Sequence, residues 1–300
     1  MSNKPEKTSQ EKQDALNEKT SKSEKDTHSA DIIDLNSYKS AKTAQLDAYD
    51  YLEKAQLART NSTAVKYAKM ALELDPTLTD AKIIIAVKQS KSPEILQLNL
   101  EKLLREEEAY LKTLDITEEK CAGDYYQIFE TRPYLRAYKE YVEILIAQGK
   151  MRKAVQACNK ICLLNESDNL GSRYTLMALY AHLEEQSLAE ELYQKYTESN
   201  SFMLLPLIAL YYKLDDIDSA SKYLNILYEN NKNIKKAIQF LNSGDETILT
   251  NIIDSPYYTP YSEEEFIIAF IDNLFLYGPI PAFLKWLTNT ILKRKIKGRK

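Results

Sequence analysis

Four basic residues in the middle of the chain have the types and spacing that suit recognition of carboxylates. Arg132 and Arg136 lie four positions apart and therefore share one face of a helix. Lys139 follows closely, and Arg173 stands near the start of the next helix that we expect. Guanidinium groups that converge in a groove bind carboxylates through paired hydrogen bonds. The spacing predicts a site for an acidic peptide or a terminal carboxylate.

A second interpretation gives the same residues a structural role only. Glu130, Glu140 and Glu143 lie near the arginines in sequence, so ion pairs between them would stabilise the helices without binding a partner. The hypothesis of a binding groove also includes three apolar or aromatic residues of the same helices, Tyr138, Met177 and Tyr180. Rigid aromatic side chains are common in peptide-binding grooves. Both interpretations stay open at this point.

The cysteines and histidines offer little for metal or acid–base chemistry. Cys158 and Cys162 have the i, i+4 spacing of half a metal site, but no second pair and no nearby histidine completes it. We expect them to be small buried hydrophobic residues. His28 and His182 are the only histidines, and neither has an evident partner. The sequence predicts no metal site and no cofactor.

The glycine content argues against the common catalytic folds. Only 6 of the 300 residues are glycine, whereas average usage is about 7%. Nucleotide-binding α/β enzymes need glycines in their phosphate loops, and β-sandwiches need frequent turn residues. No Gly-rich loop and no evident Ser or Cys nucleophile is present. We therefore expect a helical protein that binds a partner and is not an enzyme.

The charge is distributed unevenly along the chain. Residues 285–300 hold seven basic residues and no acid. Because the whole chain has a net charge of −4, the first 284 residues carry −11. An acidic body argues against nucleic acid as a partner. Neither a signal peptide nor a membrane-spanning segment is evident, so the expected location is the cytoplasm.

The pattern of apolar residues predicts an all-α fold built from antiparallel helical hairpins. We expect residues 1–40 to be a disordered polar leader and residues 41–230 to form the hairpins. A small residue recurs early in the second helix of three hairpins, at Ala154, Ala189 and Ala220. The expected helix pairs are 134–147 with 151–164, 169–183 with 187–198, and 201–214 with 217–229, preceded by hairpins within 41–76 and 80–114.

These repeats resemble the tetratricopeptide repeat. The alanines are spaced by 35 and 31 residues, which bracket the 34-residue period of that family. The first unit matches the family pattern of small residues and a closing proline at Ala64, Ala71 and Pro76. The segments 72–76, 130–137 and 164–174 are similar to a bacterial group related to the suppressor-of-tumorigenicity-seven proteins. The resemblance implies a right-handed solenoid whose first helices line a concave groove.

The C-terminal region has two interpretations. Residues 231–292 are expected to form a helical cap over the end of the array, followed by a basic tail at residues 293–300. Alternatively, the last helix and the tail lie on an anionic membrane surface. The residues for that contact would be Phe283, Trp286, Lys293, Arg294 and Lys295. The preferred function is a scaffold for a protein or peptide partner, and the alternative is a peripheral membrane adaptor.

Overall fold

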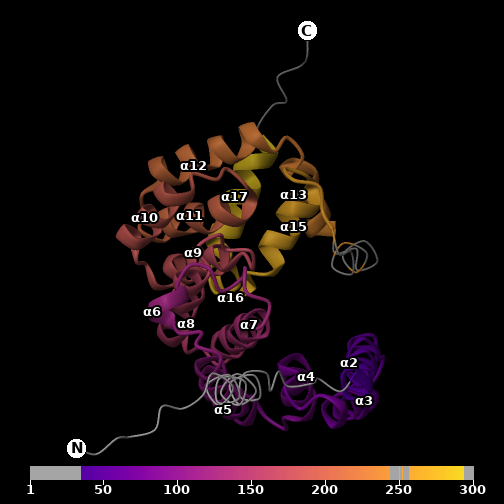
Figure 1. Cartoon of the computed structure of the whole chain (residues 1–300). Helices are drawn as coiled ribbons and strands as arrows, with labels where there is room; N and C mark the ends of the chain where they lie inside the picture. Colours follow the sequence, from indigo (N-terminus) through magenta and orange to yellow (C-terminus); the bar gives the residue numbers. More distant parts are fainter. Residues whose placement is uncertain (1–34, 244–249, 251, 253–256, 294–300) are drawn as a thin grey trace, which may run out of the picture.

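The computed structural model describes residues 35–243, 250, 252 and 257–293, and within these residues every regular element is a helix (Figure 1). The expectation of an all-α chain is confirmed for this part of the protein. The first helix, α2, begins at Leu35, before the expected boundary at residue 41. No helix in the described ranges has the length and apolar character that crossing a bilayer requires.

Five antiparallel hairpins follow one another along the chain. Each pairs a first helix with a second: α2 (Leu35–Gln56) with α3 (Asn61–Leu74), α4 (Thr79–Gln89) with α5 (Pro93–Thr113), α7 (Arg132–Ala147) with α8 (Met151–Leu164), α9 (Ser172–Leu183) with α10 (Gln186–Tyr196), and α11 (Ser201–Lys213) with α12 (Ile217–Asn230). The short helix α6 (Glu118–Cys121) lies between the second and third hairpins. Helices pack against their neighbours in sequence, as expected for a helical array.

Local capping signals explain most of the helix boundaries. Ser92, Asn200 and Asp216 each accept a hydrogen bond from a backbone N–H three residues ahead, which satisfies a donor in the first turn. Gly149 adopts a φ of 69° in the turn between α7 and α8, a conformation that favours glycine. Thr131 directly precedes α7 but its side chain makes no capping hydrogen bond; its hydroxyl donates to the carbonyls of Tyr125 and Ile128, which precede it in the chain.

Small residues let the two helices of each hairpin approach closely. Ala154, Ala189 and Ala220 are completely buried, each with 0% of its surface exposed. The packing forms two hydrophobic cores, a small one among α2, α3 and α4 and a large one that extends from α4 to α17 (Pro281–Lys293). Figure 1 shows α2 to α5 below the main body of the molecule.

The C-terminal helices fold back onto α9 and α11, which are the first helices of the fourth and fifth hairpins. These C-terminal helices are α13 (Ile234–Ser243), α15 (Glu263–Ile271), α16 (Leu274–Tyr277) and α17. Helix α15 packs on α11, α16 packs on α9, and α17 contacts both α11 and α13. The buried Glu265 fixes this arrangement, because its carboxylate accepts hydrogen bonds from the backbone N–H groups of Ser201 (2.8 Å) and Tyr261 (2.7 Å). A helix expected at residues 246–253 lies largely outside the described residues.

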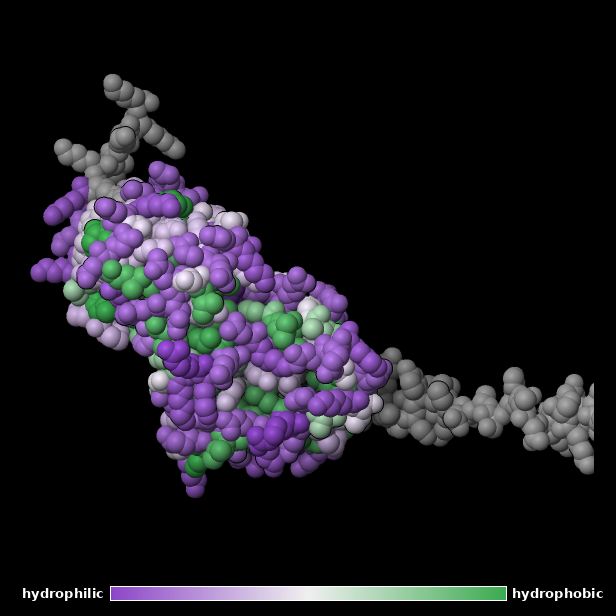
Figure 2. Space-filling view, turned by 90° about the vertical axis from the view of Figure 1, so that its left-hand side faces the viewer, coloured by the Kyte–Doolittle hydropathy of each residue, from purple (hydrophilic) through white to green (hydrophobic). Residues whose placement is uncertain are grey.

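The surface is mixed in character. On the face drawn in Figure 2, hydrophobic residues form small separate groups among hydrophilic ones. Isolated apolar residues of this kind are normal on protein surfaces. The search for a functional site therefore depends on concave features and charged side chains.

Candidate binding cavity

A cavity of about 780 Å³ lies where the C-terminal segment covers the array. It is lined by α7, α8, α9 and α11 on the array side, and by Tyr258, the end of α15 and the start of α16 on the other. We call it the α7–α16 cavity. Its volume is in the range of known ligand pockets, which are about 300–1,000 Å³.

Aromatic side chains from distant parts of the chain form one wall of the cavity. The ring of Phe202 lies 5.2 Å from that of Tyr174 and 5.6 Å from that of Tyr258, measured between centroids. Phe275 of α16 completes the set and contacts His182 at 5.7 Å. Rings at these separations pack favourably and give a rigid apolar surface.

Three charged side chains of the described residues line the cavity, and two of them are acidic. Lys139 and Glu143 lie one turn apart on α7, and Asp272 follows α15. All three reach solvent, although the protein atoms of the cavity walls surround the carboxylates of Glu143 and Asp272 closely enough to desolvate them in part. Among the described residues, neither carboxylate has a hydrogen bond or an ion pair, and Lys139 makes no ion pair within 4 Å. The cavity therefore carries one more negative than positive group.

The cavity walls perturb the ionisation of its acids. Burial among protein atoms raises the pKa of Glu143, Lys139 opposes the rise, and Asp272 adds to it. Burial also raises the pKa of Asp272, again opposed by Lys139. The pKa of Glu140, on the same helix, is raised by burial and by Glu143. Crowded carboxylates of this kind are stabilised when a cation approaches them.

The remaining polar groups near the cavity are weak candidates for chemistry. Cys158 lines the cavity, but burial raises the pKa of its thiol far above the ordinary value, so the nucleophilic thiolate does not form at neutral pH. Burial likewise raises the pKa of Cys162 to about 12. Burial lowers the pKa of His182 and keeps it neutral. No group of three or more metal-ligating side chains occurs among the described residues.

Arg136 is bound within the protein and does not line the cavity. Its Nε and Nη2 atoms donate to the carboxylate of Asp80 on α4, at 2.7 and 2.6 Å. This bidentate pair joins the second and third hairpins, and hydrogen bonding to Asp80 raises the pKa of Arg136. An ion pair was one of the two interpretations of the sequence, although the acids expected to form it were Glu130, Glu140 or Glu143.

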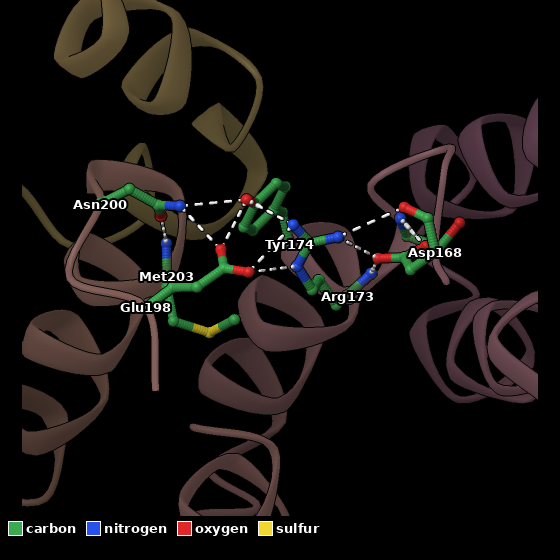
Figure 3. A network of polar contacts seen from close by, with 7 residues as sticks. Asp168, Arg173, Tyr174, Glu198, Asn200 and Met203 are labelled. Atoms are coloured by element: carbon green, nitrogen blue, oxygen red, sulfur yellow. Dashed lines mark hydrogen bonds and ion pairs between the residues drawn. The ribbon is translucent and has the colours of Figure 1, made fainter. Parts of the chain in front are cut away.

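Arg173 is the centre of a network that joins the third, fourth and fifth hairpins (Figure 3). It donates to Asp168 at 2.8 Å and to Glu198 at 3.0 Å, and its guanidinium lies 4.2 Å from the centroid of the Tyr174 ring. The Tyr174 hydroxyl donates to Glu198 at 2.6 Å, and Asn200 donates to the same carboxylate at 2.8 Å. Only 16% of the Arg173 side chain is exposed. Its charge is therefore already neutralised.

The same network explains where α9 begins. The carboxylate of Asp168 accepts hydrogen bonds from the backbone N–H groups of Ser172 (2.8 Å) and Arg173 (2.9 Å). These two bonds satisfy donors in the first turn of α9, as a capping side chain does. Asp168 itself is buried, with 3% of its surface exposed, so its charge depends on Arg173 and on these two N–H groups.

The other residues of the predicted groove lie apart from the cavity. Arg132 donates to the carbonyl of Tyr126 at 2.9 Å and lies over the rings of Tyr126 and Phe129. Tyr138 packs edge-on against Tyr134. Met177 and Tyr180 are buried in the core, with 0% and 6% of their surfaces exposed. They are unavailable to a partner in this structure because α9 is enclosed by its neighbours.

Of the seven residues predicted to form the groove, Lys139 alone lines the cavity. The sequence analysis missed Asp272 and the aromatic wall, and it considered Glu143 only as a partner for arginine. The wall combines Tyr174 and Phe202 of the array with Tyr258 and Phe275, which reach the cavity only because the C-terminal segment folds back onto α9 and α11. One signal in the sequence pointed to this coverage. Helices α9 and α11 are apolar on nearly all sides, and such helices are enclosed by others.

Two of the five residues proposed for membrane contact pack against other helices of the protein. Phe283 is completely buried and contacts Tyr212 and Tyr277, with ring centroids 5.4 and 6.0 Å away. Trp286 is half-buried against Tyr212. Lys293 is exposed, whereas Arg294 and Lys295 lie outside the described residues. The apolar side of α17 faces the protein core, as expected for a capping helix.

Comparison with known proteins places the chain in no family. No protein-family model and no curated protein sequence matches it. The resemblance to tetratricopeptide-repeat proteins and to the bacterial group named above therefore stays a prediction.

Proposed function

We propose that this protein is a non-catalytic interaction scaffold, and that it binds a segment of another protein at the α7–α16 cavity. The array would be a right-handed solenoid of the tetratricopeptide type, with its first helices on the concave side. The observation that carries the proposal is the cavity itself, whose described lining includes aromatic rings and three charged groups. Apolar pockets with a few polar groups at defined positions are typical binding sites.

The position of the cavity supports this proposal. Its lining comes from α7, α8, α9 and α11 and from the C-terminal segment, so a bound segment would contact several hairpins at once. Tyr174, which lines the cavity, is held by its hydrogen bond to Glu198 and by the Arg173 guanidinium over its ring. This part of the cavity wall is therefore organised before any partner arrives, which lowers the entropic cost of binding.

An acidic partner was expected from the sequence, and the internal pairing of the arginines limits that possibility. A carboxylate would have to compete with Asp80 for Arg136, and with Asp168 and Glu198 for Arg173. Lys139 is the one basic residue that lines the cavity among the described residues. The acidic partner is retained as an alternative outcome of the experiments below.

A blocking variant tests the proposed function. Ala147 lines the cavity and is exposed, so Ala147→Trp should fill the cavity while leaving the hairpin cores intact. Leu188 on α10 is also exposed but does not line the cavity, which makes Leu188→Trp a matched control. Each variant is used for quantitative affinity purification from the cells that produce the protein. We expect partners retained by the wild type and by Leu188→Trp to be lost from Ala147→Trp. Equal retention by both variants would contradict the proposal.

A further inference from the structure

The α7–α16 cavity contains more negative charge than it can balance internally. Glu143 and Asp272 face Lys139, and the three groups sum to one negative charge when all are ionised. Glu140 adds a further acid nearby on α7. Neither cavity carboxylate makes a hydrogen bond or ion pair with a described residue, although both are close enough to Lys139 to be influenced by its charge. The cavity is therefore electrostatically prepared for one more positive group.

The aromatic wall supplies a second, independent attraction for a cation. The π face of an aromatic ring is negative and attracts ammonium and guanidinium groups within about 6 Å of its centroid. One ring of this wall already contacts a cation, because the Arg173 guanidinium lies 4.2 Å from the centroid of the Tyr174 ring. Phe202, Tyr258 and Phe275 provide further ring surface inside the cavity. These rings also provide apolar contact for the carbon chain that carries such a charge.

We propose that the α7–α16 cavity binds an organic cation, namely the side chain of an arginine or lysine in the bound protein segment. Its charged end lies between Glu143 and Asp272, and its methylene groups lie along the aromatic wall. This inference rests on the proposed function, because it specifies the chemistry of the partner at the same site. The sequence analysis predicted an acidic partner segment, whereas this inference predicts a basic one.

Steering by the rest of the molecule favours the same partner. The whole chain has a net charge of −4 and its first 284 residues carry −11, so this part of the molecule attracts basic segments and repels acidic ones at long range. An acidic ligand would have only Lys139 to bind among the described residues of the cavity, with Glu143 one turn away on the same helix. A basic ligand meets two carboxylates and one lysine.

The test uses n-butylguanidinium as a probe that reproduces the end of an arginine side chain. Its neutral control is n-butylurea, which has nearly the same shape, and its anionic control is hexanoate. Each is titrated into the full chain, and binding is followed by amide chemical shifts in NMR spectra. We expect n-butylguanidinium to bind with a dissociation constant on the order of millimolar, as its small size implies. It should shift the amide signals of cavity residues, and the two controls should bind at least about tenfold more weakly.

Two variants with opposite expected effects on cation binding make the test specific to the cavity. Glu143→Gln removes a negative charge and should weaken n-butylguanidinium binding by about tenfold. Lys139→Met removes the competing positive charge and should strengthen it several-fold. Both residues are exposed, so the variants should fold, and melting curves monitor this directly. Asp272→Asn provides a second loss of negative charge from a different element.

The results can reject the cation site while the proposed function survives, and they can reject the proposed function while the cation site survives. Equal binding of n-butylurea, stronger binding of hexanoate, or weaker cation binding by Lys139→Met would each reject the cation site. If Ala147→Trp still loses its protein partner in that case, the scaffold survives with a different recognition chemistry. If n-butylguanidinium binds as expected but Ala147→Trp keeps its partners, the cavity binds cations and the proposed function is wrong.

Discussion

Arg136 on α7 donates two hydrogen bonds to the carboxylate of Asp80 on α4, at 2.7 and 2.6 Å. The pair connects the first helices of two successive hairpins, and 43% of the arginine side chain is exposed. Arg136 belongs to the segment that the sequence indicated as a binding site, whereas Asp80 lies outside it. In the structure the guanidinium is committed to the protein itself, and it holds the second hairpin against the third.

This pair should contribute to stability but only modestly. Because it is partly exposed, solvent screens the charges, and we expect Arg136→Ala to lower the free energy of unfolding by about 0.5–1 kcal/mol. A double-mutant cycle with Asp80→Ala isolates the interaction, since the two single changes should not add. Chemical denaturation measures each variant. Fully additive effects would show that the two residues do not interact in solution.

The Arg173 network should matter more, because it is buried. Arg173→Ala leaves the carboxylate of Asp168, whose side chain has 0% exposure, without its cation. Removing one partner of a buried pair typically costs about 3–5 kcal/mol. We expect a loss in that range, with α9 losing protection in hydrogen exchange near Ser172. The matched comparison is Arg132→Ala, whose guanidinium contacts a carbonyl and two rings. A loss below about 1 kcal/mol for Arg173→Ala would contradict the network.

Enlarging a buried alanine tests the packing within the hairpins. Ala189 is completely enclosed between α10 and its neighbours, so Ala189→Leu should overpack the hairpin and destabilise it by about 1–3 kcal/mol or more. Ala282 begins α17 and is exposed, so Ala282→Leu is a control with the same change in volume. Both variants are compared by their denaturation midpoints. Similar midpoints for the two variants would show that the helices do not approach each other closely at Ala189.

The cavity acids predict a defined dependence on pH. Burial raises the pKa of Glu143 in the folded state above its value in the unfolded chain, which is about 4.3. The folded protein therefore holds this proton more tightly, and stability is lost as the pH rises through the raised pKa. Glu143→Gln should accordingly stabilise the protein at pH 7. The gain should disappear below about pH 4, where the carboxyl is protonated in both states.

Thermal or chemical unfolding of Glu143→Gln and wild type across this pH range shows whether the substitution raises or lowers the stability. Asp272→Asn should behave in the same direction, because burial also raises the pKa of Asp272. Exposed Glu53 on α2 lies outside the cavity, and Glu53→Gln serves as the control for loss of a surface carboxylate. Destabilisation by Glu143→Gln at pH 7 would contradict the electrostatic description of the cavity.

The helices could be predicted from the sequence because their signals are local. Gly149 ends one helix in a left-handed turn, Asp216 caps another, and Ala154 marks where two helices approach closely. Each of these effects depends on residues within one hairpin. The period of apolar residues therefore sufficed to place the five hairpins, and the main difference was the earlier start of α2 at Leu35.

The site was less predictable because it depends on contacts between distant segments. Arg136 pairs with Asp80 on α4. No local sequence pattern indicates that it pairs with Asp80 and not with Glu140, which lies on the same helix as Arg136. Asp272 and Phe275 reach the cavity only because α15 and α16 fold back onto α11 and α9. Met177 has helical spacing suited to a groove, but α9 packs against α8, α10, α11 and α16, and Met177 is completely buried.

Site-specific photo-crosslinking tests the central claim, that the α7–α16 cavity is where a partner binds. Benzoylphenylalanine is introduced at Ala147 in the cavity, or at Leu188 on α10 as the control, and the protein is irradiated in the cells that produce it. We expect a crosslinked species of one defined mass from position 147, and none of that mass from position 188. Identical products from both positions, or no product from position 147, would contradict the account.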